Sequence, residues 1–162
     1  MSNELTLQDK RPSILDIRMD SKRFPRLSSY KRDDAIFHMT KIVSQAFLYR
    51  GQASDPANVN FIATSLVDEL LQEERYGARH LSFEEVSRIV KDAVLNDPDM
   101  FGISVASLYR VILNWCKGEG CRIQQQANDL YRQREAEALR NSVIAPMIQA
   151  YTGKLIRNNK IK

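Results

Sequence analysis

The stretch that decides the fold runs from Leu81 to Lys117 and reads LSFEEVSRIVKDAV, LNDPDMFG and ISVASLYRVILNWCK in succession. Its first part opens with a capping box, in which the Ser82 hydroxyl accepts from the Glu85 amide and the Glu85 carboxylate accepts from the Ser82 amide. Ser104 stands in the equivalent position before the last part. The pattern predicts one helix after each serine, and Pro98 marks the loop between them.

Apolar residues recur at helical spacing before this stretch as well. One helix is expected from about Arg32 to Gly51, and a second begins where Asp55 and Pro56 supply a cap and a favourable first position. The sequence therefore predicts an all-α protein, a compact bundle of about four helices plus a longer, weakly amphipathic C-terminal helix. The expected core comprises Ile36, Val43, Phe47, Ile62, Leu66, Leu70, Val86, Ile89, Val90, Leu108, Ile112 and Trp115.

The chain is expected to have four parts. Residues 1–31 are predicted to be a largely irregular basic segment, 32–120 a helical core domain, 121–152 a C-terminal helix and 153–162 a basic tail. Within the first part, Ile14, Leu15 and Ile17 are expected to be able to form one short helical turn or strand that docks on the body. Gly118 and Gly120 are placed to break the helix before them, and Pro146 is expected to kink or end the last helix. A thin apolar stripe on that helix is typical of one that projects or pairs with another chain.

The net charge of +4 is unevenly distributed over the 162 residues. Residues 1–32 hold eight bases and four acids, 33–121 hold eight bases and thirteen acids, and the last ten hold four bases and no acid. An acidic body with basic ends favours attraction to a polyanion such as DNA, although solvated tails have the same composition. No apolar run is long enough to span a membrane and no signal peptide is visible, so a cytoplasmic protein is expected.

Signals for catalysis are thin. The chain has no glycine-rich phosphate loop, no Gly-x-Ser-x-Gly and no paired histidine motif, so we expect no catalytic residue and no cofactor. Cys116 and Cys121 match no metal motif, and Cys116 lies on an apolar helix side, where a buried thiol is expected. The carboxylates clustered between Asp68 and Glu74 are interpreted as a solvated face, and no metal site is predicted.

The segment from Gly102 to Arg110 resembles the turn and recognition helix of bacterial helix-turn-helix proteins. At helical spacing, Arg110, Asn114 and Lys117 share a polar face with Ser107, and these residue types hydrogen-bond base edges or phosphates. Two features depart from the resemblance. The loop before Gly102 is longer than the usual three- or four-residue turn, and the surrounding sequence is acidic.

A second resemblance covers residues 60 to 140 in outline. A helical N-terminal part, the capped Leu-Ser-Phe-Glu-Glu-Val helix, the Met100 to Ser104 turn, a helix ending in Leu113-Asn114-Trp115 and a long Arg/Gln-rich helix follow one another. This order is similar to small uncharacterised proteins of phages and integrated elements in Bacteroidetes, some of which resemble replication-accessory or helicase-loader proteins. The resemblance implies an accessory role and no catalytic residue.

The leading expectation is a non-catalytic, DNA-associated accessory protein that binds phosphates through its basic ends. The alternative is a protein–protein adaptor, or a protein that self-associates through its C-terminal helix without nucleic acid. The candidate nucleic-acid-binding residues are Lys22, Arg23, Arg26, Lys31, Arg32, Lys154, Arg157, Lys160 and Lys162 for phosphates, and Arg110, Asn114 and Lys117 for bases.

Overall fold

A computed structural model describes the backbone of residues 11–159 and the side chains up to residue 148. The chain divides into two compact units, residues 1–124 and residues 125–162. The helices are α1 (Ile14–Met19), α2 (Arg32–Tyr49), α3 (Pro56–Gln72), α4 (Phe83–Asn96), α5 (Val105–Trp115) and α6 (Cys121–Asn159), with short turns η1 (Leu27–Ser29), η2 (Ala78–His80) and η3 (Cys116–Gly120). The described residues contain no strand beyond one isolated bridge, so the all-α prediction is confirmed.

The predicted caps begin the helices of the first unit. Ser82 accepts from the Glu85 amide at 3.3 Å, and Glu85 Oε2 accepts from the Ser82 amide at 2.7 Å. Asp55 accepts from an amide in the first turn of α3, and Ser104 Oγ accepts from the Ser107 amide at 3.1 Å. These bonds satisfy amides that the start of a helix leaves without partners, which fixes where each helix begins.

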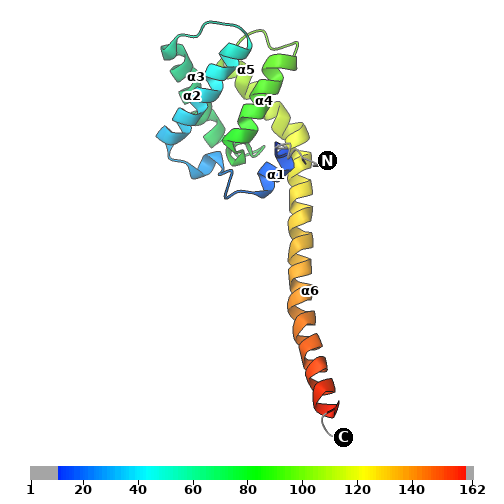
Figure 1. Ribbon diagram of the computed structural model, residues 1–162. Helices are drawn as coiled ribbons and strands as arrows, with labels where there is room; N and C mark the ends of the chain where they lie inside the picture. The colour runs from blue at the N-terminus through cyan, green and yellow to red at the C-terminus, as the bar shows by residue number, and fades with distance from the viewer. Residues whose placement is uncertain (1–10, 160–162) are drawn as a thin grey trace, which may run out of the picture. The chain divides into compact units, whose positions relative to one another are not determined.

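The core of the first unit lies between α2, α3, α4 and α5. Figure 1 shows α2 packed beside α3 and α4, while α5 packs on α3 and α4 from the other side. Ten of the twelve predicted core residues are buried. Ile36 and Trp115 are the exceptions, because they lie at the edge of the cluster and pack against it while partly exposed.

The N-terminal segment contains one short helix, α1, in the part that the structure describes. Ser13 and Asp16 form a capping box that starts α1, and Ile17 and Leu27 are fully buried. The Leu27 amide donates to the Leu81 carbonyl at 2.7 Å, immediately before α4. Of the two forms expected for the apolar residues of this segment, the structure has the short docked helical turn, which packing stabilises despite its length.

The glycines that were expected to end the helix after α5 do not interrupt the helical backbone. Gly118 and Gly120 lie in η3, a π-helical turn that leads directly into α6, and α6 continues through Pro146. Neither glycine has a positive φ. A proline removes only one amide donor, and the exposed surface of α6 lets water bind the carbonyl left free, so the helix persists there.

The two glycines of η3 should respond in opposite ways to alanine. A Cβ at Gly120 would lie 2.7 Å from Cζ3 and 2.9 Å from Cε3 of Trp115, whereas a Cβ at Gly118 would meet nothing within 4 Å. Gly120→Ala should therefore destabilise the protein by about 1–3 kcal/mol. Gly118→Ala, the matched control, should be neutral or stabilise by about 0.5–1 kcal/mol, because alanine restricts the unfolded chain. Urea unfolding followed by the fluorescence of Trp115 measures both, and equal effects would contradict the packing described.

Candidate nucleic-acid interface

Of the predicted phosphate-binding residues, Lys22, Arg23 and Lys31 are exposed on the first unit, and so is Arg32, which has a carboxylate partner. Lys22 and Arg23 lie in the turn after α1, and Lys31 is the N-cap residue of α2. The guanidinium of Arg23 lies over the Phe24 ring, 5.3 Å from its centroid. The structure thus leaves these three cations at the surface, as binding to phosphate requires.

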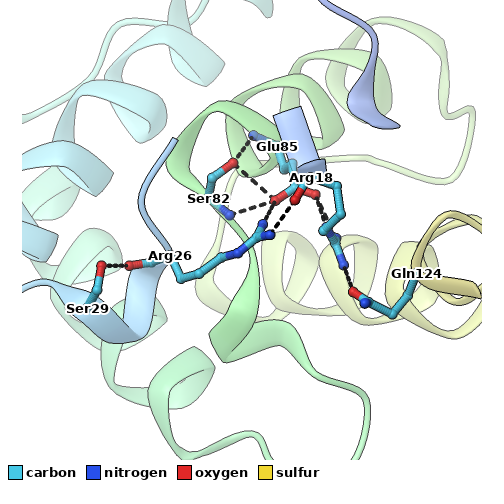
Figure 2. A network of polar contacts seen from close by, with 6 residues as sticks. All are labelled: Arg18, Arg26, Ser29, Ser82, Glu85 and Gln124. Carbon is cyan, nitrogen blue, oxygen red and sulfur yellow. Dashed lines mark hydrogen bonds and ion pairs between the residues drawn. The ribbon is translucent and has the colours of Figure 1, made fainter. Parts of the chain in front are cut away.

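Arg26 instead belongs to an intramolecular network around the buried Glu85 (Figure 2). Its Nη1 lies 3.4 Å from Glu85 Oε2, and its Nη2 donates to the Arg18 carbonyl at 2.6 Å. Arg18 lies 2.6 Å from Glu85 Oε1 and is itself buried. The Glu85 carboxylate therefore pairs with two arginines and also caps α4. Arg26 stabilises the fold through this pair and is not free to bind phosphate.

The same network reaches the beginning of α6. Figure 2 shows the Arg18 side chain extending between Glu85 and Gln124, and its Nη1 donates to Gln124 Oε1 at 2.6 Å. Sequence reasoning identified Glu85 only as a cap and did not single out Arg18. The available signal was the amphipathic Ile-Leu-Asp-Ile-Arg turn, in which Arg18 adjoins the buried Ile17.

Arg32 also has a carboxylate partner. Its Nε and Nη2 donate to the two Asp68 oxygens at 2.8 and 2.6 Å, in the bidentate geometry that guanidinium and carboxylate favour. The hydrogen bond from Arg32 lowers the pKa of Asp68, and the same bond raises the pKa of Arg32. Binding of Arg32 to a phosphate would have to displace this exposed pair.

The three predicted base contacts do not form one free face. Arg110 and Asn114 are exposed on α5, and Arg110 Nη2 donates to the Asp99 carbonyl at 3.2 Å. Lys117 lies in η3, with its Nζ 4.5 Å from the centroid of the Tyr76 ring. The structure therefore brings Arg110 and Asn114 to one helix and directs Lys117 toward the loop that follows α3.

The segment before α5 differs from a compact helix-turn-helix. The loop between α4 and α5 covers residues 97–104 and includes Asp97 and Asp99. A surface hollow of about 400 Å³ lies beside it, lined by Asp99, Phe101, Ser107 and Arg110 among others. The negative charges of Asp97 and Asp99 in this loop oppose the approach of phosphates.

The second unit contributes a helix rich in exposed apolar side chains. Leu139, Val143, Ile144, Met147 and Ile148 are each between 49% and 67% exposed. Lys154 and Arg157 belong to the same helix by their backbone, and Lys160 and Lys162 lie outside the described residues. The sequence predicted a thin apolar stripe here and, as the alternative function, self-association through it.

Metal-ligand geometry and thiol chemistry can be judged for the described residues. They contain no group of three His, Cys, Asp or Glu side chains that is suitable for a metal ion. Both cysteines are free, and burial raises the pKa of the Cys116 thiol to about 12, which leaves it protonated and unreactive at neutral pH. The predicted burial of Cys116 is confirmed, and Cys121 is exposed.

Within the described part of the chain, no helix combines the length and apolar character needed to cross a membrane. Comparison with family models, with curated proteins and with solved structures gives no match to this chain.

Proposed function

We propose that the chain is a non-catalytic, DNA-associated accessory protein whose phosphate contacts come mainly from its C-terminal segment. The observation that carries the proposal is the charge order of the second unit. Residues 138–162 contain five bases and no acid, whereas residues 33–121 contain five more acids than bases. A cationic segment in a chain whose other unit is largely acidic directs a polyanion to one part of the molecule. The resemblance to replication-accessory proteins of phages supports the same function.

The contacts of the first unit reduce the set of phosphate-binding candidates. Arg26 and Arg32 already have carboxylate partners. Releasing Arg26 would remove one cation from the buried Glu85, and releasing Arg32 would leave the exposed Asp68 carboxylate facing DNA. Lys22, Arg23 and Lys31 are exposed and remain candidates. We assign the larger share of binding to Lys154, Arg157, Lys160 and Lys162, with the exposed Arg140 beside them, and a lesser role to Arg110 and Asn114.

Charge-neutralising variants test this assignment. Changing Lys154, Arg157, Lys160 and Lys162 together to Gln should make the slope of log K against log salt for duplex DNA less steep by about 3.6. The matched control changes four bases elsewhere, Lys41, Arg75, Lys91 and Arg122, to Gln and removes the same net charge. The control should leave the slope nearly unchanged. Equal losses in both variants would mean that net charge, and not the C-terminal segment, governs binding.

A protein–protein adaptor is the second candidate function, and a separate observation favours it. Five large apolar side chains are exposed together on α6. Soluble proteins tend to cover such groups in an interface. This function does not compete with DNA binding, because the apolar residues and the bases that follow them occupy successive parts of the same segment.

A further inference from the structure

Two exposed aromatic rings of α2 each lie beside a lysine. Phe37 is 59% exposed and Tyr49 is 40% exposed. Lys41 Nζ lies 4.2 Å from the centroid of the Phe37 ring, and Lys91 Nζ, from α4, lies 5.4 Å from the centroid of the Tyr49 ring. The exposed Leu48 shares the outer side of α2 with Phe37 and Lys41 at helical spacing. These five residues, Phe37, Lys41, Leu48, Tyr49 and Lys91, are called the α2 platform.

Aromatic neighbours hold the Phe37 ring in place. The His38 ring meets it edge to face, with the two centroids 5.8 Å apart. His38 in turn stacks on Phe83 of α4 at 5.0 Å and meets the edge of Tyr30 at 5.2 Å. A ring that is already positioned loses little conformational freedom when a ligand binds to it, which favours affinity.

The α2 part of the platform is cationic, although the body as a whole is acidic. Residues 35–50 contain Lys41 and Arg50 and no acid. Asp34 is three residues before Phe37 and is the acid of α2 that comes closest to the platform in sequence. A polyanion on this side of α2 therefore meets cations from Lys41 onward.

The acids of α4 near Lys91 do not cancel its charge. Glu84 is two turns before Lys91, but its Oε1 lies 3.1 Å from Arg88 Nη2, so that pair is neutral. Asp92 follows Lys91 in sequence, yet it lines a separate surface hollow together with Val111 of α5. Lys91 thus adds a second cation beside the rings of the platform.

We propose that the α2 platform binds single-stranded DNA, with bases stacked on Phe37 and Tyr49 and phosphates held by Lys41 and Lys91. The inference rests on the proposed association with DNA and names the form of DNA that this surface takes. Proteins hold single strands in this way without reading their sequence, because every base has a face that can stack on an aromatic ring. The 12-residue separation of the rings spans about 18 Å of helix, so they contact bases that are not adjacent.

Other partners fit the platform less well. Aromatic residues are enriched in protein–protein interfaces, but lysines are depleted from the cores of such interfaces. Here each ring has a lysine beside it. A cation–π contact at an exposed site is weak compared with base stacking, so a base can take the place of the lysine, which then reaches the phosphate. Duplex DNA cannot use the rings, because its bases remain inside the stack.

Binding of a fluorescently labelled oligothymidine of about 15 nucleotides tests the proposal. The full-length chain with Lys154, Arg157, Lys160 and Lys162 changed to Gln is the background, because the C-terminal bases would otherwise add binding of their own. In this background, Phe37→Ala and Tyr49→Ala should each weaken binding about tenfold, whereas Phe37→Trp should preserve it. Circular dichroism checks that each variant keeps its helices.

Phe61→Ala is the matched control for Phe37→Ala. Phe61 is a similarly exposed phenylalanine on the neighbouring helix α3, 64% exposed, and its truncation should leave binding unchanged. Equal affinities of the Phe37→Ala and Phe61→Ala variants would overturn the proposal. Failure of the background protein to bind the oligothymidine at low salt would overturn it as well.

The lysines of the platform are tested through salt dependence. Changing Lys41 and Lys91 to Gln in the same background should make the slope of log K against log salt for the oligothymidine less steep by about 1.4. The control changes the exposed Arg122 and Arg132 to Gln, which removes the same charge, and should leave the slope unchanged. Equal changes in both variants would contradict phosphate binding by the platform.

Competition identifies the kind of nucleic acid. An unlabelled duplex of the same length should displace the oligothymidine from the background protein poorly, and equal displacement would show that charge and not stacking governs binding. Binding of an oligouridine in preference to the oligothymidine would overturn the assignment to DNA. The duplex slope that tests the C-terminal segment is measured without single strands, so failure of the proposed function and failure of the α2 platform are distinguishable.

Discussion

Glu85→Ala should lower the free energy of unfolding by about 3–5 kcal/mol. The Glu85 carboxylate is fully buried and lies 2.6 Å from Arg18 and 3.4 Å from Arg26. Its removal leaves the buried guanidinium of Arg18 without its countercharge and also deletes the cap contact to Ser82. An uncompensated buried charge costs far more than an exposed pair contributes. Chemical denaturation monitored by circular dichroism measures the loss.

Glu84→Ala provides the matched control for Glu85→Ala. Glu84 precedes Glu85 in the first turn of α4 but pairs with Arg88 at the surface, where its side chain is 46% exposed. Loss of such a pair should cost no more than about 1 kcal/mol. Similar losses in the two variants would show that Glu85 acts only as a residue of the helix start and that the network in Figure 2 contributes little.

Leu66→Ala and Ile112→Ala should each destabilise the protein by about 2–5 kcal/mol. Both side chains are fully buried, one on α3 and the other on α5, where the two helices pack. Truncation removes apolar contacts and leaves a cavity that the surrounding helices fill only in part. Urea unfolding provides the measurement.

Phe61→Ala is the control for the core substitutions. Phe61 lies on α3 but is 64% exposed, so its truncation should change stability by no more than about 0.5 kcal/mol. Losses below about 0.5 kcal/mol at both Leu66 and Ile112 would contradict the assigned core. A large loss of stability at Phe61 alone would mean that the face of α3 assigned as exposed is in fact the buried one.

The parts of the fold that could be predicted depend on local chemistry. Ser82 and Glu85 are three residues apart and Asp55 adjoins Pro56, so the backbone amides they satisfy are set by the sequence itself. Gly120 was expected to end the helix, but it lies within the π-helical turn. Its small size matters there because the Trp115 ring packs against it, a contact that the sequence does not reveal. Helix-breaking tendencies are averages, and packing or solvent exposure at a given residue can outweigh them.

The candidate site was less predictable for a related reason. Composition identifies bases but not their partners, and Arg26, Arg32 and Lys22 are indistinguishable by that criterion. The structure separates them through contacts over long sequence distances, such as Arg26 with Glu85 and Arg32 with Asp68. The apolar stripe of α6 could be recognised in the sequence, but only the structure showed that Leu139 and Val143 are exposed.

A binding titration of the intact chain tests the central claim most directly. Fluorescently labelled random duplex and single-stranded oligonucleotides are titrated with protein at low salt, and the duplex series is repeated as salt is raised. If about six bases reach phosphates, the account predicts duplex binding with a log–log slope of about −5. The absence of detectable binding to either oligonucleotide at low salt would contradict the proposed function.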